Sequence, residues 1–125
     1  PLAGGLLTGK HAGQDQLPEG GRFHANEMYQ SRYWKDAYFQ AVERIRSACA
    51  RENVWMADAA HRWLNHHSLM AERGDDAVII GVSSADHLAA NLAACKAGPL
   101  PEAIVAAYDE AWALARPECP KYFRP

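Results

Sequence analysis

Hydrophobic residues recur at helical spacing in the first half of the chain. Tyr38, Val42, Ile45 and Cys49 follow one another at intervals of four, three and four residues, with mostly charged or small residues between them. This period places the four side chains on one face of a helix. The pattern predicts a helical segment that begins near Glu27 and includes this face.

The same spacing predicts two more helices. Residues 56–66 form one, and residues 101–114 form the other, with Pro101 suited to a first helical turn. The apolar face of the first would consist of Met56, Ala59, Ala60, Trp63 and Leu64. That of the second would consist of Ile104, Ala107, Tyr108, Ala111 and Leu114.

A different pattern covers residues 77–81, where the run AVIIG is continuously apolar. Such a run is typical of a strand buried on both faces, as in a parallel sheet. Ser83 and Asp86 form a Ser-x-x-Asp helix start, and the helix 85–97 would end at a glycine C-cap, Gly98.

Residues 1–10 resemble the end of a strand entering a glycine loop, and residues 11–26 a long loop. The order of strand, loop, helices, strand and helices indicates an α/β fold with a parallel sheet. Two strands cannot close a barrel and would leave open edges, so we expect a fragment of a larger domain.

Composition narrows the function classes. The chain has 125 residues, which suits one domain at most, and a formal net charge of −2. That charge gives no general attraction to nucleic acid or an anionic membrane, and no apolar run is long enough to span a bilayer. We see no signal peptide, and we expect the odd set of three cysteines, Cys49, Cys95 and Cys119, to be free thiols in the cytosol.

Two turns have the composition of phosphate sites. The first runs from Gly4-Gly5 to Gly9-Lys10, where glycines let backbone N–H groups approach an anion and Lys10 adds a charge. It is not a Walker loop, because His11 follows the lysine. The second is Ser83-Ser84 at a helix N-terminus. Ordinary loop geometry and helix capping explain each turn separately, but in (β/α)₈ barrels phosphate binds between the loops after strands 7 and 8.

Other residues suggest no further chemistry. His61, His66 and His67 share a helix at intervals of five and one, not the four that zinc ligands need, so we predict no metal site. Trp55, Trp63 and Trp112 lie beside apolar stripes, and we expect all three in the core.

Several segments together resemble the aldo-keto reductases, and among them the aflatoxin-aldehyde reductase subfamily. These segments are PLAGGLLTGK, GRF, EMYQSRYW, HRWLNHHS, GDDAVIIGVSSADHLAANL and ECPKYFR. They are collinear and cover nearly the whole chain. The resemblance implies a (β/α)₈ TIM barrel. Residues 1–125 would be its C-terminal part: strands 7 and 8, helices 7 and 8, an extra C-terminal helix and the tail of one NADP-dependent oxidoreductase domain.

The resemblance also implies that NADPH is the cofactor. Its pyrophosphate would be wrapped by Pro1, Leu2, Ala3, Gly4, Gly5, Leu6, Leu7, Thr8, Gly9 and Lys10, and covered by Arg22. Its adenosine 2′-phosphate and adenine would contact Ser83, Ser84, His87 and Asn91. The family usually has Gln or Arg at the position of His87 and Glu at that of Ala90.

Tyr29, Arg32 and Arg124 would contact the substrate. Two arginines suit a carboxylate, which implies small carbonyl substrates that also carry an acid, such as succinic semialdehyde, alongside dicarbonyls such as aflatoxin dialdehyde. The alternatives are a surface salt bridge for Arg32 and a solvated terminus for Arg124. The full-length protein would be cytoplasmic, with a homodimer allowed and no nucleic-acid or membrane partner.

The family's catalytic Asp, Tyr, Lys and His belong to the first half of the barrel and have no counterpart here. This chain would therefore contribute no catalytic residue and no metal ligand. Two alternatives stay open: a regulatory or binding subunit on the same scaffold, and a truncated inactive product that aggregates or stays molten when expressed alone.

Overall fold

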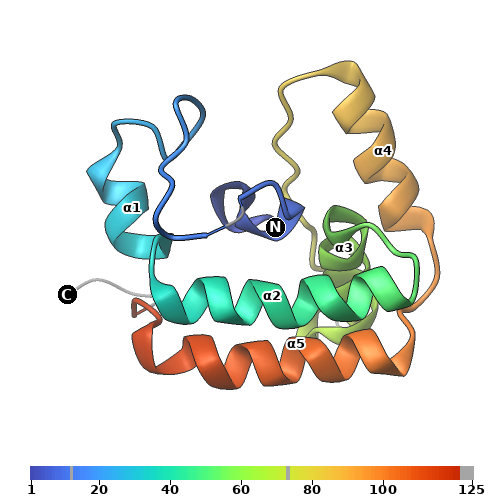
Figure 1. The fold of residues 1–125 in the computed structure, drawn as a ribbon. Helices are drawn as coiled ribbons and strands as arrows, with labels where there is room; N and C mark the ends of the chain where they lie inside the picture. The colour runs from blue at the N-terminus through green and yellow to red at the C-terminus, as the bar shows by residue number, and fades with distance from the viewer. Residues whose placement is uncertain (12, 73, 122–125) are drawn as a thin grey trace.

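The computed structural model describes residues 1–11, 13–72 and 74–121 (Figure 1). Its regular elements are all helical. They are η1 (Ala3–Thr8), α1 (Glu27–Tyr33), α2 (Asp36–Arg51), α3 (Met56–His67), η2 (Leu69–Glu72), α4 (Ala85–Lys96), α5 (Glu102–Ala115) and η3 (Arg116–Glu118). The predicted helices are confirmed, and the segment that begins at Glu27 divides at Trp34 into α1 and α2.

The base of the molecule is the pair α2 and α5, which run antiparallel side by side (Figure 1). Val42, Ile45 and Cys49 of α2 are buried, as the spacing predicts. They form one core with Ile104 and Ala107 of α5. Because burial of these stripes removes apolar area from water, it is the main force that holds the two helices together.

Helix α3 packs on both base helices, on α4 and on η1. Its polar side chains fasten the connection between α4 and α5. Arg62 donates from Nε to the Gly98 carbonyl at 2.7 Å and from Nη2 to that of Pro99 at 2.5 Å. His66 bonds the Ala97 carbonyl, and His67 Nε2 accepts from the Leu100 amide. These two histidines are therefore structural, and no cluster of metal-ligating side chains occurs in the described residues.

The predicted strand at 77–81 is wrong for this structure, as is the strand end at 1–10. No described residue lies in a strand, and residues 77–82 have no regular secondary structure. Ile79 is 89% exposed, where a buried strand would hide it. A strand is stable only when neighbours pair its N–H and C=O groups, and helices cannot supply that pairing.

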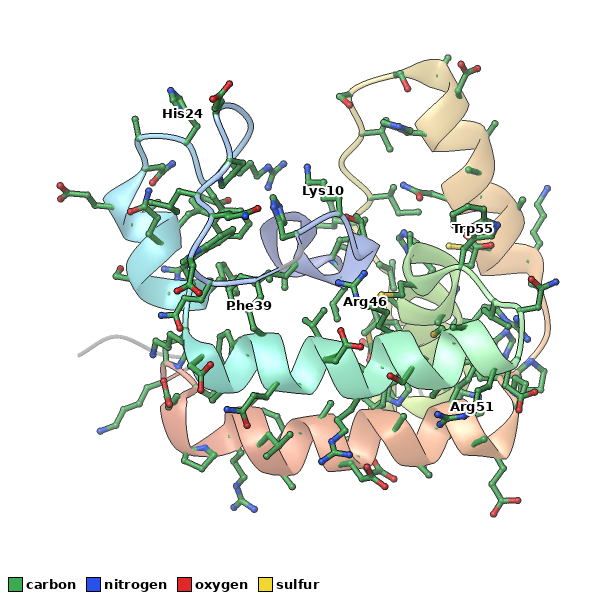
Figure 2. All side chains as sticks on the ribbon, viewed as in Figure 1. Lys10, His24, Phe39, Arg46, Arg51 and Trp55 are labelled. Carbon is green, nitrogen blue, oxygen red and sulfur yellow. The ribbon has the colours of Figure 1, made fainter. Side chains whose placement is uncertain are left out.

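Two of the three core tryptophans were also predicted wrongly. Trp55 is 81% exposed and Trp112 is 53% exposed. Trp63 packs against the core and stacks on Tyr108 with ring centroids 5.7 Å apart. Proximity to an apolar stripe did not distinguish these cases, because Trp55 lies before the first turn of α3 and its side chain is exposed there (Figure 2).

Two helix ends differ in detail from the prediction. The N-cap of α4 is Ser84, one residue after the expected Ser83, because the Ser84 side chain accepts from the His87 amide. Gly98 is not a left-handed C-cap: α4 ends at Lys96 with Ala97 extended, and Gly98 has no positive φ. The breaker that follows, Pro99, accounts for the stop. Within the described residues, no helix has the length and apolar character needed to cross a bilayer.

Candidate functional site

The glycine turn, residues 1–10, is held in a backbone conformation that few residues adopt. Gly4 has φ 70° and Gly5 has φ 111°, and Ala3 before them also has a positive φ of 47°. A β-carbon on Gly4 would lie 3.0 Å from Phe23 Cζ and 3.2 Å from Tyr29 Cδ1. The turn therefore needs glycine both for its dihedral angles and for the two rings that pack on it.

Lys10 folds back over this turn. A β-carbon on Gly5 would lie 3.3 Å from Lys10 Cε and 3.5 Å from Nζ. Thr8 Oγ1 donates to the Gly5 carbonyl at 2.7 Å and is 3.4 Å from the Lys10 amide. An ammonium beside a close-lying glycine backbone is an arrangement suited to an anion.

Arg22 connects the long loop to two other parts of the site. Its Nη1 lies 3.3 Å from the Tyr29 hydroxyl, and the guanidinium lies 5.9 Å from the centre of that ring. Its Nη2 lies 3.9 Å from the point where a β-carbon on Gly81 would sit. Gly81 is two residues before Ser83, so Arg22 lies between the tyrosine that packs on the glycine turn and the segment leading into α4. In the described part of the chain, neither Lys10 nor Arg22 pairs with a carboxylate.

The N-terminus of α4 carries the second predicted phosphate turn. Ser84 Oγ accepts from the His87 amide at 3.2 Å, and Ser83 Oγ hydrogen-bonds His87 Nδ1 at 3.2 Å. Ser83, Ser84 and His87 are exposed, and Asn91 one turn later is half-buried. The first turn of a helix attracts anions through its free N–H groups. The three exposed side chains add polar hydrogens at the same place.

The predicted substrate residues are only partly brought together. Tyr29 lies against Gly4, and its ring centroid is 6.0 Å from that of Tyr33. Arg32 lies over the Tyr33 ring at 6.0 Å and makes no ion pair among the described residues, unlike the surface salt bridge considered from sequence. Arg124 lies outside the described residues, so its place with Arg32 at one substrate pocket stays a prediction.

Side chains that sequence reasoning did not single out hold the loop in place. Arg46 bonds the carbonyls of Gly9 and His11. Gln30 Nε2 donates to the Phe23 carbonyl, and Trp34 Nε1 donates to that of Gln14, each at 2.7 Å. All these acceptors are backbone atoms, which leave no mark in the sequence.

Two histidines, His11 and His61, are buried, which the sequence did not predict. His11 packs edge-on against Phe23 and Trp34, and its Nε2 has no hydrogen-bond partner. His61 is 1% exposed, and neither ring nitrogen has a partner. Burial is the main cause that lowers the pKa of each, helped by Lys10 at His11 and by the Pro1 amino group at His61. At His61 the nearby Asn91 side chain and Asp58 act in the opposite direction and offset part of the shift. Neutral imidazoles are therefore favoured at both positions.

A pocket borders the glycine turn, but Lys10, Arg22 and the start of α4 do not line it. It has a volume of 570 Å³ and is lined mostly by apolar side chains of the base helices, such as Val42, Ile45 and Trp112, together with Leu6 of the glycine turn. Neither Tyr29 nor Arg32 lines it. The candidate site is consequently an open surface of backbone turns and cationic side chains.

The comparisons with known proteins fit these features. The chain is 44% identical to Aldo-keto reductase family 7 member A3 of Homo sapiens, over 99% of this chain and 40% of that protein. It is 44% identical to Aflatoxin B1 aldehyde reductase member 2 of Mus musculus, over 99% of this chain and 36% of that protein. The human protein of the latter name is 43% identical over 99% of this chain and 37% of its own length. The chain thus spans well under half the length of these relatives. The sequence profile of the Aldo/keto reductase family matches residues 1–113, and the chain belongs to that family.

Proposed function

We propose that the full-length protein carrying this chain is a cytosolic reductase that reduces aldehydes and ketones with NADPH. This chain would form the C-terminal part of the family's (β/α)₈ barrel and supply contacts to cofactor and substrate. The observation that carries the proposal is the position of Arg22, between Tyr29 and the segment that leads into α4. One cation thereby lies between the tyrosine that packs on the glycine turn and the segment that leads to Ser83.

The residues present fit a dinucleotide phosphate. Gly4 and Gly5 keep the turn free of side chains, and Lys10 supplies a charge over it. We assign the pyrophosphate to this turn and to Arg22. The cofactor would supply the hydride, and the residues of this chain would bind and orient the cofactor.

The start of α4 would take the 2′-phosphate that distinguishes NADPH from NADH. Ser83 and Ser84 carry hydroxyls, and the first helical turn carries free N–H groups. His87 can donate to the same phosphate, and more strongly when protonated. Asn91 would contact the adenine.

For the substrate, we assign Tyr29, Arg32 and Arg124 to one carbonyl pocket. A guanidinium binds a carboxylate through two parallel hydrogen bonds, so the favoured substrates carry an acid group, as succinic semialdehyde does. Two relatives are named for aflatoxin B1 aldehyde. A dialdehyde of that kind is a second proposed substrate.

The test uses the full-length protein. NADPH and NADH affinities are measured by quenching of tryptophan fluorescence, and reduction of succinic semialdehyde is followed at the NADPH absorbance. We expect NADPH to bind at least about tenfold more tightly than NADH, a difference of about 1.4 kcal/mol. Equal affinities would refute the role of the α4 turn. Tight NADPH binding without reduction of any aldehyde would instead indicate a regulatory subunit.

A matched pair of variants tests Arg22. Arg22→Met should weaken NADPH binding because it removes the cation between the two turns. Arg44→Met, on the outer face of α2 beside Gln40 and Ser47, should leave binding unchanged. An equal effect of both changes would mean that overall charge, and not the position of Arg22, governs affinity.

A further inference from the structure

Arg46 of α2 makes three hydrogen bonds, two of which reach far along the chain. Its Nη1 donates to the Gly9 carbonyl at 2.7 Å, and its Nη2 donates to the His11 carbonyl at 3.1 Å. Its Nε donates to Glu43 Oε2 at 3.0 Å, one turn earlier on the same helix. The guanidinium is therefore fixed on its own helix while its two terminal nitrogens hold the loop.

The two carbonyls that Arg46 binds lie on either side of Lys10. Gly9 has a positive φ of 77°, and a β-carbon there would lie 3.3 Å from Arg46 Nη1. The loop backbone is thus pressed directly against the guanidinium. The peptide group before Lys10 and the carbonyl of the residue after it are both held, so the direction in which the Lys10 side chain leaves the backbone is restrained as well.

Figure 2 shows the consequence for the site. Arg46 lies between α2 and the glycine turn, and Lys10 extends beyond the turn on the side away from α2. Lys10 Nζ lies 3.5 Å from the point where a β-carbon on Gly5 would sit. The arginine thus holds the backbone from below while the ammonium covers the turn from above.

We propose that Arg46 is a positioning residue for the glycine turn assigned to the pyrophosphate. It acts by fixing the loop backbone so that Lys10 lies over the Gly4–Gly5 turn. This inference rests on the proposed function and deepens it. The pair with Glu43 is a minor part of it, since Glu43 is largely exposed and exposed ion pairs contribute little. The bonds to the two carbonyls carry the effect, because charged donors make the stronger hydrogen bonds.

Arginine suits this role better than lysine. Its planar fork presents separate N–H groups to two acceptors at once, whereas an ammonium on a flexible stem is a point charge. Arg46→Lys should therefore restore only part of the effect that Arg46→Met removes.

The control is Arg62, which makes the same kind of contact elsewhere. It also donates to two backbone carbonyls, those of Gly98 and Pro99, but these lie in the connection between α4 and α5. Arg62→Met removes equivalent bonds and should lower the thermal midpoint to a similar extent. It should leave the glycine turn intact.

The experiment measures binding of two probes to the full-length protein and to both variants. NADPH engages the glycine turn, whereas adenosine 2′,5′-bisphosphate lacks the pyrophosphate and nicotinamide and engages only the α4 end. We expect Arg46→Met to weaken NADPH binding about tenfold, the effect of losing bonds to a charged donor, and to leave the bisphosphate affinity unchanged. Arg62→Met should change neither. Equal losses for both probes would mean a general structural effect and would overturn the proposal.

A double-mutant cycle tests whether Arg46 acts through Lys10. If it does, Arg46→Met in a Lys10→Met background should cost no further NADPH affinity. Additive losses would overturn the proposed route.

A readout without cofactor separates this inference from the proposed function. Trypsin cleaves after Lys10 only when the loop opens, and mass spectrometry measures the rate of that cleavage in the native protein. Arg46→Met should accelerate it and Arg62→Met should not. If the wild-type protein binds no NADPH, the proposed function fails, but the trypsin rates still test whether Arg46 holds the loop at Lys10. If Arg46→Met leaves the trypsin rate unchanged, the positioning role fails even where NADPH binds.

Discussion

The ring of Tyr29 lies directly against Gly4, with Cδ1 only 3.2 Å from the point where a β-carbon would sit. The residue assigned to the substrate and the turn assigned to the cofactor therefore form one packed unit. Phe23 closes the same contact, with Cζ 3.0 Å from that point. Any side chain at Gly4 must displace both rings, and the turn with them.

Gly4→Ala should accordingly destabilise the protein and weaken NADPH binding. The change forces a non-glycine residue to φ 70° and pushes the rings of Phe23 and Tyr29 away. We expect a loss of about 1–3 kcal/mol in the free energy of unfolding, measured by urea denaturation. Gly20→Ala is the control, because Gly20 has an ordinary φ and no atom within 4 Å of its β-carbon position. A Gly4→Ala protein as stable as Gly20→Ala would contradict the packing described.

His61→Leu should stabilise the protein at neutral pH. The imidazole is 1% exposed with neither nitrogen bonded, and a buried polar group without a partner costs about 1–3 kcal/mol. Leucine removes that cost while filling similar space. The free energy of unfolding from urea titrations checks this, with exposed His24→Leu as the control. A destabilised His61→Leu protein would show that the histidine has a partner.

His61 should also make stability depend on pH. Its pKa is lowered from 6.5 in the folded protein, chiefly by burial, so the unfolded chain binds the proton more readily. The folded state therefore loses stability as the pH falls below about 6.5, the ordinary pKa of histidine, and keeps it above that value. His11 shifts in the same direction. Thermal midpoints between pH 5.5 and 7.5 should fall on acidification, and less steeply in His61→Leu; an unchanged slope would exclude His61 as a source.

The three thiols should react in order of exposure. Cys119 is exposed, Cys95 is partly exposed and Cys49 is buried. Burial also raises the pKa of Cys49 to about 11, which further suppresses its thiolate. With a thiol-reactive disulfide reagent at pH 8, Cys119 should be modified first and Cys49 only on unfolding. Mass mapping of the modified peptides gives the order, and early labelling of Cys49 would contradict its burial.

The two serines before α4 should separate into a structural and a binding residue. Ser84→Ala removes the cap that accepts from the His87 amide, and should lower the free energy of unfolding by about 1 kcal/mol. Ser83→Ala leaves the cap in place and should affect only NADPH affinity. Urea denaturation and NADPH titration of both variants check this. Equal destabilisation by the two variants would mean that Ser83 also stabilises the start of the helix, as its spacing to Asp86 first indicated.

The apolar stripes of α2, α3 and α5 were determined by the sequence alone. Val42 and Ile45 belong to such a stripe in α2, and Ile104 belongs to one in α5. A helix with an apolar stripe is stabilised most when that stripe is buried. The glycine turn and the serines at 83–84 were also visible, because their special backbone requirements restrict the residue types there. The family resemblance rested on the same local segments and was confirmed.

Only the tertiary structure decided which side chains meet across long stretches of chain. Arg46 binds carbonyls more than thirty residues away, and carbonyls are common to every residue, so no spacing reveals the contact. Trp55 and Trp63 are the same residue type, and both lie beside an apolar stripe. Trp55 is nevertheless exposed and Trp63 is packed, since burial depends on which elements cover each side chain. Residues 77–81 have strand composition but no strand partner in the described structure. A helix completes its hydrogen bonds within its own segment and can be read locally, whereas a strand depends on neighbours that local sequence does not specify.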